Sequence, residues 1–117
     1  MALALNVYKT KVGIASTTEA QIYKAPVGYT GVVLYGNFAN IGSNIQNVTL
    51  SHNRPIRSSG TISTVVTEIF EEFPIDPKDA FDAIRGKLFL EPGDFIKIQA
   101  SNNTDIKYIF SILETLN

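Results

Sequence analysis

The feature that most constrains the fold is a series of short segments in which apolar and polar residues alternate, separated by Gly, Pro, Asn and Ser. The clearest is 105–114, where one face would hold Ile106, Tyr108, Phe110 and Ile112. A period of two residues is typical of β-strands. The pattern predicts strands at 6–13, 19–24, 31–40, 45–51, 62–73, 86–91, 95–101 and 105–114.

These segments predict an all-β chain. About eight short strands without the spacing of parallel β-α-β units indicate an antiparallel β-sandwich, either jelly-roll or immunoglobulin-like. A length of 117 residues suits one domain, so 1–117 is expected to form a single sandwich. The polar stretch 51–60, SHNRPIRSSG, is expected to be an exposed loop or arm.

One short helix is expected at 77–84. Asp76 would serve as its N-cap, and Pro77 suits the first helical position because its missing N–H is not needed there. Phe81 and Ile84 lie three residues apart and would anchor the helix to the sheet.

A Pro-Gly turn interrupts the stretch 86–101, GKLFLEPGDFIKIQAS. Proline presets φ at the second position of a β-turn, and glycine supplies the positive φ that a type II turn needs at the third. The two flanking apolar runs therefore form either a hairpin or a corner between strands. Glu91 and Asp94 at this turn are candidate contacts to a neighbouring subunit.

Charge and composition argue against several functions. Ten basic and eleven acidic residues give a net charge of −1, which gives no electrostatic preference for nucleic acid or an anionic membrane surface. The chain has no cysteine, so disulfides, thiol nucleophiles and zinc-thiolate sites are excluded. We expect no cofactor and no metal.

Catalytic motifs are also missing. His52 is the single histidine, and no Gly-x-Ser-x-Gly or phosphate-binding glycine motif occurs. An enzyme would have to use His52 with the acidic segment 68–82, and we expect no enzymatic activity. Calcium is a weaker alternative for that segment because the EF-hand spacing is missing. We interpret the segment as a solvated or partner-facing acidic edge that includes Glu71 and Glu72.

The natural complement of this acidic edge is basic. Arg54 and Arg57 would supply it, from the same chain or from another copy. A separate alternative is a carbohydrate- or receptor-binding module, with Tyr23, Tyr29 and Tyr35 as a surface stripe.

Motifs spread over about residues 20–115 resemble small tailed-bacteriophage, cyanophage-like, virion structural proteins in their order. In those chains a G-K-L-x-L-x-x-G-D corner precedes a strand and the chain closes on an S-I/V-L-E strand. The corresponding segments here are 25–30 (APVGYT), 32–34 (VVL), 37–40 (NFAN), 48–50 (VTL), 73–75 (FPI), 86–94 (GKLFLEPGD) and 111–114 (SILE).

The resemblance implies a β-sandwich of the capsid surface, neck or tail that assembles in multiple copies. Its implied partners are further copies of this chain and other virion proteins, and its implied location is the virion. This chain departs from the pattern between Ser51 and Phe73, where the segment is longer and more charged. A contact peculiar to this particle is expected there.

Overall fold

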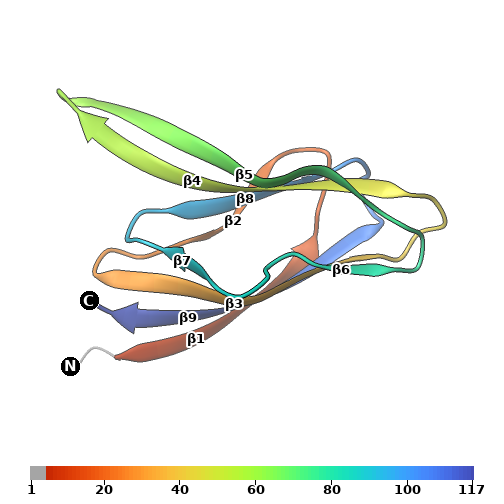
Figure 1. Ribbon diagram of the computed structural model, residues 1–117, viewed down its shortest axis with the longest axis horizontal. Coiled ribbons are helices and arrows are strands. Elements are labelled where there is room, and N and C mark those ends of the chain that lie inside the picture. Colours follow the sequence, from red (N-terminus) through yellow and green to blue (C-terminus); the bar gives the residue numbers. More distant parts are fainter. Residues whose placement is uncertain (1–4) are drawn as a thin grey trace.

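The chain folds into two antiparallel sheets packed face to face (Figure 1). A computed structural model describes residues 5–117. The first sheet contains β1 (Asn6–Ile14), β9 (Ile106–Leu116), β3 (Tyr29–Asn40), β6 (Ala80–Asp82) and β7 (Leu88–Leu90). The second contains β2 (Ala20–Lys24), β8 (Phe95–Ala100), β4 (Gln46–Ser58) and β5 (Thr61–Ile75).

Strand order follows a regular pattern in both sheets. The order is β1-β9-β3-β6 in the first sheet, where β7 also pairs with β3, and β2-β8-β4-β5 in the second. Every described pairing is antiparallel. The predicted all-β antiparallel sandwich is confirmed, with nine strands instead of about eight because β6 forms where the helix was expected.

The helix predicted at 77–84 is wrong, and the described chain 5–117 contains no helix, hence none long and apolar enough to cross a membrane. Residues 77–78 form a turn, and Ala80–Asp82 pairs with Asn37–Ala39 of β3. A helix this short is marginal without tertiary support. Pairing with β3 is favoured over a helix because it also places the Phe81 ring against the Phe70 ring, with 5.2 Å between their centroids.

The Pro-Gly turn is a corner between the two sheets. β7 pairs with β3 in the first sheet, whereas β8 pairs with β2 and β4 in the second. The Asp94 amide donates to the Glu91 carbonyl at 2.9 Å, and Gly93 has a φ of 93°. This geometry matches the Pro-Gly signature of the sequence and carries the chain across the sandwich.

Aromatic rings fill the core between the sheets. Phe38 and Phe110 are fully buried, 5.6 Å apart in an edge-to-face arrangement, and Phe70 meets Phe38 edge-on at 6.0 Å. Gly36 lies on β3 next to the Phe110 ring, where a Cβ would stand only 2.7 Å from a ring carbon. The absence of a side chain at Gly36 lets the Phe110 ring approach the strand this closely.

A buried polar pair joins the two sheets inside this core. The Tyr23 hydroxyl on β2 donates to the Glu114 carboxylate on β9 at 2.7 Å, and Glu114 is only 4 % exposed. Burial, together with the hydrogen bond and the negative charge of Glu114, raises the pKa of Tyr23 well above its usual value. The hydroxyl therefore remains a donor to the carboxylate across the physiological pH range.

Tyr23→Phe is expected to lower the free energy of unfolding by about 1–3 kcal/mol, because the buried Glu114 carboxylate loses its short hydrogen bond. Urea denaturation at neutral pH would measure the loss. Tyr8→Phe is the matched control, since Tyr8 is 76 % exposed. Equal stability of the two variants would contradict a structural role for the Tyr23 hydroxyl.

Part of the second sheet extends beyond the sandwich as a two-stranded arm, which we define as residues 54–67. β4 pairs with β8 from Val48 to Asn53, and from Arg54 onward its only partner within residues 5–117 is β5. Ser59 and Gly60 both have positive φ, 50° and 79°, as in a two-residue hairpin turn. Figure 1 shows the arm at the upper left, diverging from the other strands.

Candidate assembly surfaces

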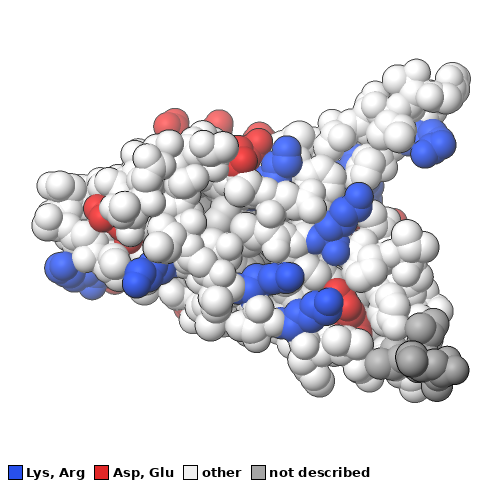
Figure 2. All heavy atoms as spheres, turned by 180° about the vertical axis from the view of Figure 1, so that it is seen from behind, with Lys and Arg blue, Asp and Glu red and all other residues white. Residues whose placement is uncertain are grey.

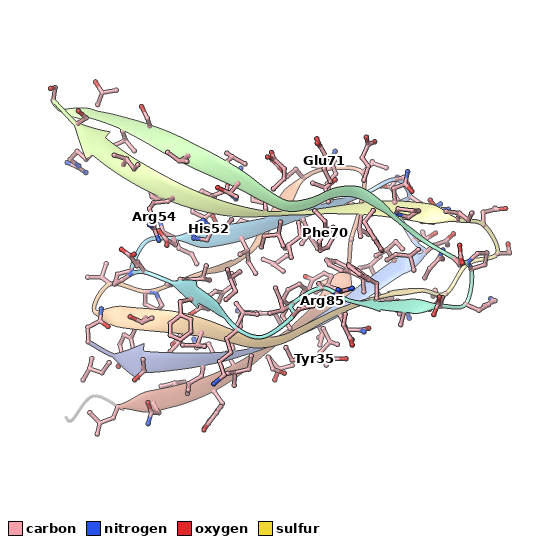
Figure 3. The ribbon with its side chains drawn as sticks, viewed as in Figure 1. Tyr35, His52, Arg54, Phe70, Glu71 and Arg85 are labelled. Atoms are coloured by element: carbon pink, nitrogen blue, oxygen red, sulfur yellow. The ribbon has the colours of Figure 1, made fainter. Side chains whose placement is uncertain are left out.

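A cluster of charged groups fixes the base of the arm to the Pro-Gly corner. The Asp94 carboxylate is 3 % exposed and accepts hydrogen bonds from Arg54 Nη2 at 2.8 Å and from Arg54 Nε at 3.1 Å. His52 Nε2 lies 3.1 Å from the same carboxylate, and the Glu91 amide donates to it at 3.0 Å. Arg54 Nη2 also pairs with Glu91 at 3.1 Å. Figure 3 shows Arg54 and His52 on the same side of β4.

The electrostatics of the cluster favour an ionised carboxylate. Burial alone would raise the pKa of Asp94, but hydrogen bonds from Arg54, the Glu91 amide and His52, together with the Arg54 charge, outweigh it and hold the pKa below its usual value. The hydrogen bond to Asp94 raises the pKa of Arg54 despite its partial desolvation. The cluster is therefore a charge-assisted clamp between β4 and the corner.

The structure thus brings three of the six predicted interface residues together within one chain. Arg54, Glu91 and Asp94 contact one another, and Asp94 is buried, so its carboxylate is already used internally. Within one chain, Arg54 pairs with Asp94 and Glu91 and not with the acidic segment. Arg54 directly follows the residues of β4 that pair with β8, and Asp94 directly precedes β8, so the register of this pairing places the two residues side by side.

The other three predicted interface residues, Arg57, Glu71 and Glu72, remain exposed on the second sheet. Arg57 lies near the tip of the arm, opposite Ile62. Glu71 and Glu72 form a bulge opposite Thr49, where Glu72 has a φ of 49° and its amide donates to the Thr49 hydroxyl at 2.9 Å. Figure 3 shows Glu71 pointing outward from β5 while Phe70 points between the sheets.

The bulge borders a shallow acidic hollow of about 560 Å³ on the outer face of the second sheet. Its acidic lining consists of Glu19, Glu68, Glu71 and Glu72. Within residues 5–117 no group of three acidic, histidine or cysteine side chains is arranged to hold a metal ion. The hollow therefore presents negative charge to solvent without a metal-binding geometry.

His52 does not contact the acidic segment 68–82, with which it would have to form an enzymatic site. Its hydrogen-bond partner is Asp94, at the arm end of the sandwich. Asp82 instead accepts from the Asn37 amide at 3.0 Å, and Asp79 caps the Ala80 amide at 2.8 Å. His52 is thus a member of the structural clamp.

The tyrosines of the predicted carbohydrate stripe do not share a surface. Tyr23 is 5 % exposed and lies in the core, bonded to Glu114. Tyr35 is 43 % exposed and points away from the second sheet (Figure 3). The stripe expected from the sequence is therefore wrong.

An apolar row that sequence reasoning missed crosses the outer face of the first sheet. Tyr8 pairs with Leu113, Leu113 with Val32, and Val32 with Phe89. Directly paired residues point to the same face of a sheet. Tyr8 is 76 % and Phe89 60 % exposed, and Val12 pairs with Ile109 further along the same face. Val32 in the middle of the row is only 7 % exposed, so Tyr8 and Phe89 form its exposed ends. Exposed apolar patches are typical of protein contact surfaces.

The arm is a second exposed apolar surface. Ile56, Ile62, Val65 and Val66 are each 45 % to 57 % exposed. Figure 2 shows the arm as a projection separated from the body by a notch, with basic atoms near its tip and mostly uncharged surface elsewhere. Isolated two-stranded hairpins are marginally stable in water, so packing against another strand or surface would stabilise an arm of this kind.

Comparison with solved structures finds the same fold in assembled particles and fibres. A chain of the T13 IBDV viral particle superposes with a TM-score of 0.58 at 8 % identity, covering 97 % of this chain and 32 % of that chain. A capsid chain of Helicobacter pylori bacteriophage KHP30 gives a TM-score of 0.51 at 10 % identity, covering 97 % and 89 %. A chain of Bacillus endospore appendages, described as disulfide-linked pili, gives 0.50 at 14 %, covering 100 % and 97 %.

At such low identities these likenesses establish the fold alone. The chain spans about a third, 32 %, of the length of the IBDV chain that it matches, but nearly the whole of the KHP30 and appendage chains. No protein-family model matches the sequence, and comparison with curated proteins finds no match. The class defined by fold and surfaces is therefore a two-sheet antiparallel sandwich with exposed apolar side chains on its first sheet and on its arm.

Proposed function

We propose that this chain is a bacteriophage virion structural protein that assembles in multiple copies by protein-protein packing, on the capsid, neck or tail. The observation that carries the proposal is the superposition of 97 % of the chain on chains of two virus particles, one of them from a bacteriophage. The proposed location is the virion, the proposed partners are copies of this chain and other virion proteins, and no enzymatic step is involved.

The strand order supports a finer assignment of the fold as a jelly roll. If β6 and β7 are counted as one interrupted strand on β3, eight strands form two sheets in the orders 1-9-3-6/7 and 2-8-4-5. In each sheet a strand from the end of the sequence lies between two strands from its first half: β9 lies between β1 and β3, and β8 lies between β2 and β4. This is the arrangement of a jelly roll, which consists of two Greek keys. Jelly rolls are common in viral capsid proteins.

The exposed surfaces support an assembly role. The apolar row on the first sheet and the apolar arm lie on different parts of the molecule, so one copy can contact two neighbours. Contacts of this kind generate rings or shells when their symmetry closes.

Mass spectrometry of purified particles would test the proposal, with this chain quantified against the major capsid protein and located by antibody labelling. The proposal predicts that the chain is present in the particles at a fixed ratio to the major capsid protein. A ratio near one chain per capsid subunit with label over the head would indicate capsid decoration, and a low ratio with label at the neck or tail would indicate a ring component. Absence from the particles would overturn the proposal.

A fibre subunit is the second candidate, favoured by the superposition on nearly the whole of a Bacillus endospore appendage chain. This chain has no cysteine, so a fibre built from it would be held without disulfides. Electron microscopy of the purified chain distinguishes the two candidates, because a fibre subunit would form filaments without other virion proteins.

A further inference from the structure

The open edge of β5 is the least protected sheet edge in the described chain. β5 lies at the end of the order β2-β8-β4-β5, so one side of its backbone has no strand partner among the described residues. Its arm segment, Thr61–Thr67, contains no charged residue, no proline and no glycine, and all of its residues except Ser63 are β-branched. Long, uncharged, exposed edges of this composition pair readily with another strand.

The other sheet edges are protected, including the outer side of β4 beyond Asn53, which carries Arg54, Pro55 and Arg57. β2 has five residues, and β6 and β7 have three each. β1 is longer but carries Lys9 and Lys11 on its inward face, paired in register with Ile112 and Phe110. Short edge strands and inward-facing lysines are common protections against edge pairing. β5 lacks both in the arm segment.

We propose that the arm is a self-association element in which β5 of one copy pairs antiparallel with β5 of a second copy about a two-fold axis. This inference rests on the proposed assembly role, and the neighbour that it specifies is a second copy of this chain. The two second sheets would then continue into one sheet across the dimer. The regular part of β5 available for this pairing ends at Glu68, because the register with β4 shifts beyond it.

Charge complementarity favours a second copy of this chain as the occupant. Arg57 pairs with Ile62 at the tip of the arm, and Glu68 lies at its base on the same outer face. An axis through Val65 places Ile62 opposite Glu68 of the second copy. Arg57 and that Glu68 then lie two strand spacings apart, about 9.6 Å, which the two extended side chains can bridge. The two-fold axis forms this pair twice.

Single cysteines provide the direct test, because the natural chain has none. Cysteine is placed in turn at each position from Ser63 to Thr67, and the purified chain is oxidised and run on a non-reducing gel. Opposed residues in antiparallel strands have Cβ atoms close to the separation that a disulfide spans. The proposal predicts disulfide-linked dimers with a maximum at the position on the axis.

Val27→Cys is the matched control for random collision, since Val27 is 93 % exposed in the turn before β3. Cross-linking in the 63–67 window that does not exceed this control at any position overturns the proposal. A maximum within the window supports it and fixes the register.

Charge variants provide a second measurement that leaves the edge backbone unchanged. Arg57→Glu and Glu68→Arg are each expected to raise the dimer dissociation constant about tenfold by sedimentation equilibrium, and the combined swap to restore it. Lys87→Glu changes the net charge equally but lies outside β5, and it should leave dimerisation unchanged. Equal effects of Arg57→Glu and Lys87→Glu would contradict the predicted ion pair.

These results are independent of the virion measurement. If the cysteines fail to cross-link but the chain is present in purified particles, the β5 edge is excluded and the virion role stands. If the cysteines cross-link but the particles lack the chain, self-association stands and the virion role fails.

Discussion

Phe38→Ala is expected to lower the free energy of unfolding by about 3–5 kcal/mol, which is a large share of the stability of a domain of this size. Phe38 is fully buried on β3 and contacts the rings of Phe70 and Phe110 at 6.0 Å and 5.6 Å between centroids. Removing the ring deletes apolar burial and leaves a cavity between two sheets that cannot easily close. Urea denaturation followed by tyrosine fluorescence would measure the loss.

Phe89→Ala is the matched control for this prediction. Phe89 is 60 % exposed on the outer face of the first sheet, so its truncation should change the stability of the isolated chain by less than about 1 kcal/mol. A Phe38→Ala variant no less stable than Phe89→Ala would mean that the aromatic cluster does not hold the sheets together.

The alternation of residues predicts most of the strands but not their arrangement. Expected and observed segments agree closely for β3 and β8, because the pattern reports which residues face the core. The helix at 77–84 failed because its capping signals are local, whereas pairing of Ala80–Asp82 with β3 is a tertiary interaction. The length of β4 was also missed, since the arm has no core face to impose a pattern.

The candidate site shows the same division between local and long-range information. The sequence singled out Arg54 and Asp94 as candidate interface residues, but it did not indicate that they contact each other across 40 residues of sequence. The apolar row on the first sheet had a visible signal in Ile109 and Leu113, which alternate with the core residues of the last strand. Its extent depends on the register with β1 and β7, which sequence alone does not provide.

Asp94→Asn is expected to lower the free energy of unfolding by about 2–3 kcal/mol at pH 7, because the amide nitrogen cannot accept the hydrogen bond that Arg54 Nε donates to Oδ1 and the buried charge that pairs with Arg54 is lost. Glu91→Gln is the matched control. The Glu91 side chain is 70 % exposed and pairs with the same arginine, so its neutralisation should cost less than about 1 kcal/mol. Equal losses would show that the buried position of Asp94 contributes nothing.

The same carboxylate makes the stability depend on pH in a defined direction. The pKa of Asp94 is lower in the folded chain than its usual value, so the folded state favours the ionised form. Ionised Asp94 contributes its full share to the free energy of unfolding above its pKa in the unfolded chain, about 3.9. This share disappears as the pH falls through the lower pKa of Asp94 in the folded chain. The difference in free energy of unfolding between the natural chain and Asp94→Asn should therefore become smaller as the pH is lowered from 5. Urea titrations repeated at intervals of about half a pH unit would measure this difference. A difference that stays constant over this range would mean that the Arg54 clamp does not favour the ionised carboxylate.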